Sequence, residues 1–207
     1  MSRPKQSEEK QEAMKSRIMD AALTLVEEHD PEDVSIRMIA ENVGVSHMVF
    51  YTYFQSRDAL IHALIKRQQQ RFQERLEALF ERIEKEDFLV VTRDALETYT
   101  RISKSRPRIF KLLWLTPKNG THAHVKPMEL FDQYITRFGE FLKIGMDAGK
   151  LRIREPKVCA TTVLGMVSAP LFLYQTGRIN NQRTRDQVLD ESIDAAMHYL
   201  TCEIHND

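Results

Sequence analysis

The chain has 207 residues, of which 42% are hydrophobic and 29% charged, so it can bury the core of one large domain or of two smaller ones. Its formal net charge is zero, so the charge of the whole chain gives no indication of a nucleic-acid partner. With only seven glycines and seven prolines, the composition favours an all-α protein, because sheets and hairpins need turn residues.

The cysteines and the apolar segments predict a soluble cytoplasmic protein. Cys159 and Cys202 are too few for a disulfide framework and are typical of a reducing compartment. Residues 1–15 have no apolar core and do not fit a secretory signal. The most apolar stretch, Val158–Tyr174, contains two threonines, a serine and a proline, which makes it too polar to favour a membrane span.

The sequence of the N-terminal part predicts three consecutive helices. Apolar residues at helical spacing from Met14 to Leu25 predict an amphipathic helix, and Pro31 breaks the pattern. Two very short helices follow in the segments SIRMIAEN and SHMVFYTYF, with Ser35 and Ser46 as N-cap residues.

The rest of the chain also reads as helices. Ser56 opens a long fourth helix, which we expect to run to about Glu86. Further helices are predicted near residues 88–103, from Pro107, around Phe131–Leu142, through the apolar stretch that follows residue 155, and at the C-terminus. Residues 116–127 read as a loop.

The segment IRMIAENVGVSHMVFYTYF has the spacing of a helix-turn-helix, the arrangement that places its second helix in the major groove of DNA. Gly44 supplies the turn, where a positive φ costs little, and the small Ala40 allows the two helices to cross closely. Ile39, Val43 and Phe50, with Val45, occupy the positions that pack these helices together. The helix-turn-helix is predicted at about residues 35–54.

The longer segment SIRMIAENVGVSHMVFYTYFQSRDAL resembles the N-terminal signature of the TetR family of transcriptional regulators, over about residues 12–62. The resemblance implies an all-α protein with a three-helix DNA-binding domain at 1–57, a larger ligand-binding and dimerisation domain at 58–207, and a fourth helix, about 57–86, shared between them. It also implies a homodimer, joined through about residues 155–206, that binds a palindromic operator and is released by a small molecule. Met48 departs from the family pattern, where glycine is frequent, as does Arg57, where lysine is usual.

The predicted recognition helix has two faces. If Phe50 and Phe54 point inward, the other side chains are left for DNA, and Met48 could contact a thymine methyl group. Arg57 lies in the first turn of the next helix, where a phosphate would offset the unfavourable position of a cation at a helix N-terminus. The predicted DNA-binding residues are Ser35, Arg37, Ser46, His47, Met48, Val49, Tyr51, Thr52, Tyr53 and Arg57. For the tyrosines simple packing is the alternative, and for Arg57 the alternative is a solvated side chain.

The C-terminal part is rich in aromatic residues and methionines, which could line an apolar pocket for an aromatic or lipophilic effector or could only fill the core. The predicted ligand-binding residues are Tyr99, Phe110, Trp114, Phe131, Tyr134, Phe138, Met166 and Phe172. Small residues at Gly165, Ser168 and Ala169, with Ala195 and Ala196, suit a tight bundle between subunits, with packing inside one chain as the alternative.

We find no sequence signature of a cofactor, a metal centre or catalysis. His122 and His124 form a His-x-His pair without a Cys or acidic residue at ligand spacing, which is a weak metal signal. There is no nucleotide-binding glycine loop and no serine elbow. We therefore expect a regulator, most often a repressor in this family, that is not an enzyme.

Two other functions remain open from the sequence. The first is a helical small-molecule-binding protein or enzyme without DNA binding, favoured by the charge of residues 1–60, where 7 Lys+Arg and 11 Asp+Glu give −4. Against it, six of those acids lie in residues 18–34, a segment that could face away from a phosphate backbone. The second is a nucleic-acid-binding protein without a ligand.

Overall fold

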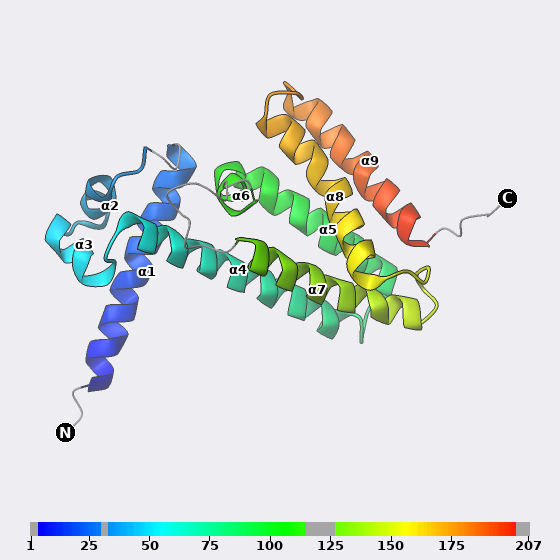
Figure 1. Ribbon diagram of the computed structural model, residues 1–207, viewed down its shortest axis with the longest axis horizontal. Coiled ribbons are helices and arrows are strands. Elements are labelled where there is room, and N and C mark those ends of the chain that lie inside the picture. Colours follow the sequence, from blue (N-terminus) through cyan, green and yellow to red (C-terminus); the bar gives the residue numbers. More distant parts are fainter. Residues whose placement is uncertain (1–3, 30–32, 115–126, 202–207) are drawn as a thin grey trace. The chain divides into compact units, whose positions relative to one another are not determined.

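The computed structural model describes residues 4–29, 33–114 and 127–201, with the side chains of 8–29, 33–110 and 132–201. The regular structure of these ranges is entirely α-helical, which confirms the predicted all-α fold (Figure 1). The helices are α1 (Pro4–Glu28), α2 (Ile36–Val43), α3 (His47–Tyr53), α4 (Arg57–Arg82), α5 (Phe88–Ser105), α6 (Pro107–Trp114), α7 (Pro127–Asp147), α8 (Pro156–Gln175) and α9 (Gln182–Thr201).

By packing, the chain forms two compact units. The N-terminal unit takes residues up to 70 together with 106–127, and α6 packs with α1 inside this unit. The C-terminal unit takes residues 71–105 and those after 127. The helix α4 contributes residues to both units, and the functional boundary predicted at residue 57 stays a prediction.

The core of the N-terminal unit is formed by the apolar faces of its helices. Ile18 of α1, Ile39 of α2, Phe50 of α3 and Leu60 of α4 are all at most 1% exposed. Removing such side chains from water is the main stabilising contribution to a unit of this size. Because α2 and α3 are too short to be stable alone, this shared core is what holds them in place.

The helix α4 ends at Arg82, four residues before the predicted end near Glu86. After Arg82 the chain forms a turn, in which the backbone N–H groups of Lys85 and Glu86 both donate to the Arg82 carbonyl oxygen. Asp87 then accepts hydrogen bonds from the backbone N–H groups of Leu89 and Val90, at 2.9 and 3.2 Å, and so caps α5. An N-cap residue has non-helical backbone angles, so α4 ends before it.

The core of the C-terminal unit includes a stack of aromatic rings. Phe141 stacks on Phe88, with ring centroids 4.9 Å apart, and on Phe138, at 6.1 Å. Gly145 lies against the same ring of Phe88, where an added Cβ would lie only 2.3 Å from a ring carbon. Any larger residue at 145 would therefore displace the ring stack.

The apolar helix α8 packs against α5 and α9 inside the C-terminal unit. By length and composition it is also the one helix of the described chain that could cross a membrane, but 44% of its apolar window is buried within the protein. A single helix of this kind is typical of a buried core helix, and it is no evidence of a membrane protein.

Candidate nucleic-acid interface and small-molecule pocket

The turn between α2 and α3 has the geometry that its sequence predicts. Gly44 has φ 77° and ψ 34°, in the left-handed region that glycine adopts without strain. Its N–H donates to the Glu41 carbonyl, and the N–H of Val45 donates to the Ala40 carbonyl at 2.9 Å. These two bonds satisfy carbonyls at the end of α2 and set the direction in which α3 leaves the turn.

Serine caps begin both helices of the pair. The Ser35 hydroxyl accepts from the backbone N–H of Met38 at 3.2 Å, and the Ser46 hydroxyl accepts from that of Val49 at 3.3 Å. Both predicted DNA-binding serines therefore use their side-chain oxygens to hold helix N-termini. Each hydroxyl retains its hydrogen and a second lone pair, either of which a contact with DNA would use.

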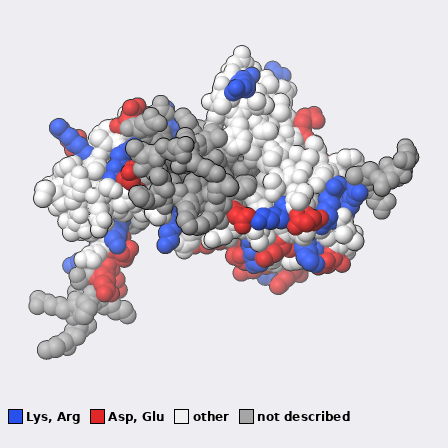
Figure 2. Space-filling view, viewed as in Figure 1, with Lys and Arg blue, Asp and Glu red and all other residues white. Residues whose placement is uncertain are grey.

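The two faces of α3 divide as predicted. Phe50 is 0% and Phe54 7% exposed, and they pack on each other and on the core of the N-terminal unit. The outward residues of α3 are His47, Met48, Val49, Tyr51 and Thr52. Tyr53 lies between the two faces, half-buried against the same core, so only part of its ring is accessible. The helix HMVFYTY has no Lys, Arg, Asp or Glu, and Figure 2 shows an uncharged surface where it lies.

Arginine side chains hold α2 at both ends. Arg57 of α4 donates from Nε to the carbonyl oxygen of Val34, just before the α2 cap, at 2.9 Å. Arg17 of α1 donates from Nη2 to the carbonyl oxygen of Val43, the last residue of α2, at 3.2 Å. Arg57 is thus anchored to the protein rather than freely solvated. A guanidinium has five N–H donors, so this anchoring leaves its predicted phosphate contact chemically possible.

Arg37 projects from the first turn of α2 and pairs with Glu41 one turn later. Its Nε donates to Glu41 Oε1 at 2.8 Å, and this hydrogen bond raises the pKa of the Arg37 guanidinium. The Arg37 side chain is 83% exposed, so the pair is screened by water and a phosphate could displace Glu41 at small cost.

A pocket of about 180 Å³ lies in the C-terminal unit, between the second half of α4, the helix α5 and the start of α7. Its walls are mostly apolar, and its polar groups come from Arg75, Arg82, Asp94, Thr98 and two tyrosines. The lining residues are Phe72, Arg75, Leu76, Ala78, Leu79, Arg82, Asp94, Ala95, Thr98, Tyr99, Ile102 and Tyr134.

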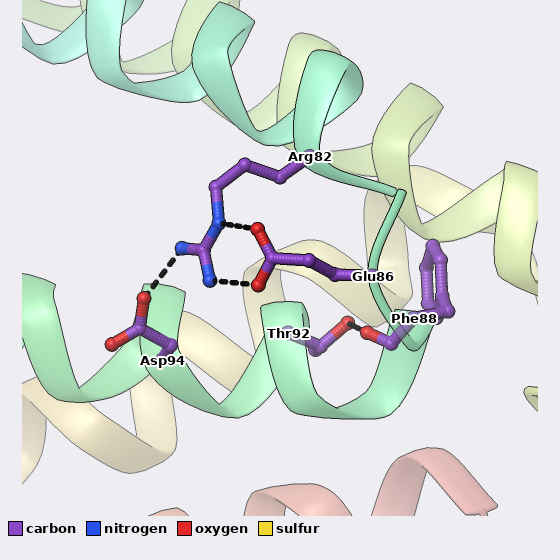
Figure 3. Close-up of polar contacts among 5 residues, drawn as sticks. All are labelled: Arg82, Glu86, Phe88, Thr92 and Asp94. Carbon is purple, nitrogen blue, oxygen red and sulfur yellow. Dashed lines mark hydrogen bonds and ion pairs between the residues drawn. The ribbon is translucent and has the colours of Figure 1, made fainter. Parts of the chain in front are cut away.

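Two ionic residues of the pocket, Arg82 and Asp94, belong to a network that joins α4 to α5. Arg82 makes two parallel hydrogen bonds with the Glu86 carboxylate, each 2.8 Å long, and donates from Nη1 to Asp94 (Figure 3). Both carboxylates raise the pKa of the guanidinium, with the Glu86 hydrogen bond as the larger cause. Arg82 therefore stays charged at physiological pH, and it contacts two carboxylates.

Tyr99 and Tyr134 are the predicted ligand-binding residues that line the pocket. The Tyr99 hydroxyl lies 2.8 Å from Ser168 Oγ of α8. Burial raises the pKa of the Tyr99 phenol, which the hydrogen bond to Ser168 partly opposes, and burial raises that of Tyr134 to about 12. Both phenols are therefore neutral at physiological pH and can serve as hydrogen-bond partners.

The other residues predicted to bind a ligand lie elsewhere. Phe138 is 2% exposed inside the ring stack, and Phe110 is 3% exposed in α6 of the N-terminal unit. Met166 and Phe172 are half-buried on α8 and do not line the pocket. The side chains of Trp114 and Phe131, like the His122 and His124 pair, lie outside the described residues.

Sequence reasoning missed the contribution of α4 to the pocket. The residues predicted to bind a ligand are all aromatic residues or methionines after residue 87, whereas half the lining comes from α4. A signal was present: Arg75, Leu79 and Arg82 on α4, and Ala95, Thr98 and Ile102 on α5, follow helical spacing that mixes polar with apolar residues. Among the described residues no group of His, Cys, Asp or Glu is arranged to hold a metal ion.

A helix-turn-helix with an exposed second helix, joined through α4 to a helical unit with a pocket, defines a transcriptional regulator of the helix-turn-helix class. The family model "Bacterial regulatory proteins, tetR family" matches residues 18–64. A second, "AefR-like transcriptional repressor, C-terminal domain", matches residues 126–202. The chain belongs to the TetR family, whose members bind DNA operators and small-molecule ligands, usually as dimers, and are generally not enzymes.

Solved structures share the fold at low sequence identity. FadR from Bacillus subtilis, in complex with stearoyl-CoA, is 13% identical with a TM-score of 0.69, over 89% of this chain and 98% of that one. The fatty acid degradation regulator FadR from Bacillus halodurans is 16% identical with a TM-score of 0.68, over 88% and 94%. RolR in complex with resorcinol is 19% identical with a TM-score of 0.63, over 94% and 91%. No curated protein sequence matches the chain.

Proposed function

We propose that this TetR-family protein is a cytoplasmic, ligand-responsive transcriptional repressor that binds a palindromic operator as a homodimer and is released by a small apolar or aromatic effector. The observation that carries the proposal is α3, whose outward residues include Met48, 76% exposed, and Tyr51, 44% exposed, on a helix held rigidly by Phe50 and the Gly44 turn. A recognition helix needs accessible side chains on a fixed backbone.

On DNA, each α3 would enter the major groove of one half-site. Two copies related by a two-fold axis would read half-sites about 34–36 Å apart, which is why the operator is expected to be palindromic. His47, Tyr51 and Thr52 would face base edges or nearby phosphates, while Arg37 and Arg57 would contact the phosphate backbone on either side.

The homodimer would form through α8 and α9. On α8 the residues Val158, Gly165, Ala169 and Leu173 are all exposed, at spacings that place them on one side of the helix, and Ala195 is exposed on α9. Small side chains let helices of two subunits approach closely. Ser168 and Ala196, two other small residues considered for this contact, are buried inside the chain instead.

The effector would occupy the pocket between α4, α5 and α7. Its volume of about 180 Å³ is comparable with the roughly 150 Å³ of an engineered protein cavity that binds benzene, which favours a ligand with a single ring. Among the proteins of similar fold, RolR has been solved with resorcinol, a ligand of that size, whereas the long acyl chain bound by the Bacillus subtilis FadR would need a larger cavity.

The helix α4 would couple effector binding to release from DNA, because it begins at Arg57 beside the helix-turn-helix and lines the pocket from Phe72 to Arg82. A ligand shifts the spacing of the two α3 helices only if it binds one position of α4 better than the other. No catalytic role is proposed for any residue of the chain.

The test of DNA binding is selection from random duplexes followed by a mobility-shift assay with the selected sequence. The proposal expects a palindrome and a two-subunit complex, whereas equal binding to scrambled duplexes at moderate salt would contradict it. Arg57→Ala is expected to weaken binding to all DNA sequences alike. It should also make the plot of log binding constant against log salt concentration shallower by about one. A changed base preference would show instead that Arg57 reads bases.

The effector is tested by thermal-shift measurements with a panel of single-ring aromatic compounds. A compound that raises the melting temperature is then added to the DNA complex and is expected to dissociate it. Ala95→Trp places a large ring in the pocket and should abolish the shift, whereas Ala148→Trp, at an exposed residue outside the pocket, should retain it. Equal responses of the two variants would exclude this pocket as the effector site.

A further inference from the structure

The exposed surface of α3 combines large apolar side chains with a few uncharged hydrogen-bonding groups. Met48 is 76%, Tyr51 44% and Val49 36% exposed, so three of the seven residues of this short helix present large apolar surfaces to solvent. Val49 and Tyr51 are two positions apart and point to different sides of the helix, with Met48 between them, so the accessible apolar surface is centred on Met48.

The side chains that most often read guanine and adenine are missing from α3. Its sequence, HMVFYTY, has no Arg or Lys to contact guanine with two hydrogen bonds and no Asn or Gln to contact adenine in the same way. The arginines of the neighbouring helices, Arg37 and Arg57, are assigned to the phosphate backbone under the proposed function, so neither supplies a base contact to α3.

The remaining hydrogen-bonding groups of α3 are those of His47, Tyr51, Thr52 and the half-buried Tyr53. The Ser46 hydroxyl oxygen caps the helix, and the His47 ring packs edge-on against Tyr51, with centroids 5.1 Å apart. Thr52 is exposed on the same helix. These groups can each contact a base edge or a phosphate, but none makes the paired hydrogen bonds that Arg, Asn or Gln makes to one base, and the 76% exposed Met48 adds an apolar contact.

In the major groove, the thymine C5-methyl is the group that an apolar side chain can recognise, because the other base edges present donors and acceptors. Methionine suits such a contact, since its unbranched side chain adapts its shape and its sulfur is polarisable. Resting on the proposed function, we propose that Met48, supported by Val49, reads thymine methyl groups, so that operator affinity depends on those methyls at the base pairs that face α3.

The test replaces single thymines of the selected operator with deoxyuridine, which removes only the methyl group. Burying a methyl-sized group contributes about 0.8 kcal/mol. Replacing one contacted thymine with deoxyuridine should therefore lower the affinity for that half-site roughly fourfold. Replacements outside the contacted positions should have no effect, which provides a control inside each duplex.

Protein variants assign the effect to Met48. Met48→Ala should bind the thymine and uracil operators equally, because the side chain that senses the methyl is gone. Its exposed position predicts unchanged folding, which circular dichroism checks. Val90→Ala, at a 58% exposed apolar residue of α5, should retain the wild-type preference for thymine.

Cytosine and 5-methylcytosine provide an independent comparison, because the second carries a methyl group where thymine has one. The protein should bind an operator with 5-methylcytosine at a contacted thymine position several-fold more tightly than the same operator with cytosine there. If a palindrome is selected but uracil, cytosine and 5-methylcytosine show no dependence on the methyl at any position, methyl recognition is wrong while the proposed function stands. If no operator is selected at all, the proposed function itself fails.

Discussion

Replacing Gly44 with alanine tests whether the turn of the helix-turn-helix depends on backbone conformation alone. Gly44 has φ +77°, and a Cβ added there would meet no atom within 4 Å. The substitution therefore creates no clash, and its cost is that of holding an L-residue in the left-handed region, about 1–2 kcal/mol. We expect the free energy of unfolding to fall by that amount.

Two variants isolate this cause. Gly44→Asn should cost less than Gly44→Ala, because asparagine adopts the left-handed conformation more readily. Gly177→Ala provides the matched control in the turn after α8, since Gly177 has φ +72° and an added Cβ there also meets nothing within 4 Å. It should lose similar stability while leaving α3 in place.

The assay combines thermal and urea denaturation with operator binding at 25 °C, where all three variants remain folded. For a chain of this length, 1–2 kcal/mol corresponds to a fall in melting temperature of roughly 2–8 °C. Operator affinity should fall for Gly44→Ala only, because Gly44 sets the direction of α3. The reasoning is refuted if Gly44→Ala is as stable as the wild type, or if both alanine variants weaken DNA binding equally.

Three further predictions concern buried groups. Phe50→Ala should lower the free energy of unfolding by about 3–5 kcal/mol through the cavity it leaves, whereas Tyr51→Phe on the opposite face should change stability little; urea denaturation of both variants checks this. Tyr99→Phe and Ser168→Ala each break one buried hydrogen bond and should cost about 1–3 kcal/mol singly, with the double variant less destabilised than the sum, as a double-mutant cycle would measure. Burial raises the pKa of the Cys159 thiol from 9.0 to about 11. The thiol therefore ionises first in the unfolded chain, and the free energy of unfolding should fall as pH rises from 9 to 11. Cys159→Ala should flatten that part of the plot of stability against pH, and an unchanged plot would contradict the role of Cys159.

The helix-turn-helix was predictable because its determinants are local. Ser35, Ser46 and Gly44 act through backbone groups three or four residues away, so their spacing in the sequence already states the contacts they make. The division of α3 into an inner face with Phe50 and Phe54 follows from helical periodicity in the same way.

The pocket was only partly predictable, because its lining is set by how distant helices pack. Tyr99 and Phe138 are both aromatic residues at helical spacing, yet one lines the pocket and the other is stacked in the core. Nothing in their local sequence distinguishes them. The contribution of Arg82 and Asp94 depends on α4 and α5 lying side by side, which their own periodicity does not state.

The sequence by itself determined the helical class, the serine caps at Ser35 and Ser46, the turn at Gly44 and the inner face of α3, since these depend on interactions within one or two turns of helix. The tertiary structure alone decided that Arg57 donates to the Val34 carbonyl, that Tyr53 is half-buried, and which residues enclose the pocket. Such contacts join residues far apart in the chain, and they are fixed by the packing of whole helices around a shared core rather than by the preference of any one segment.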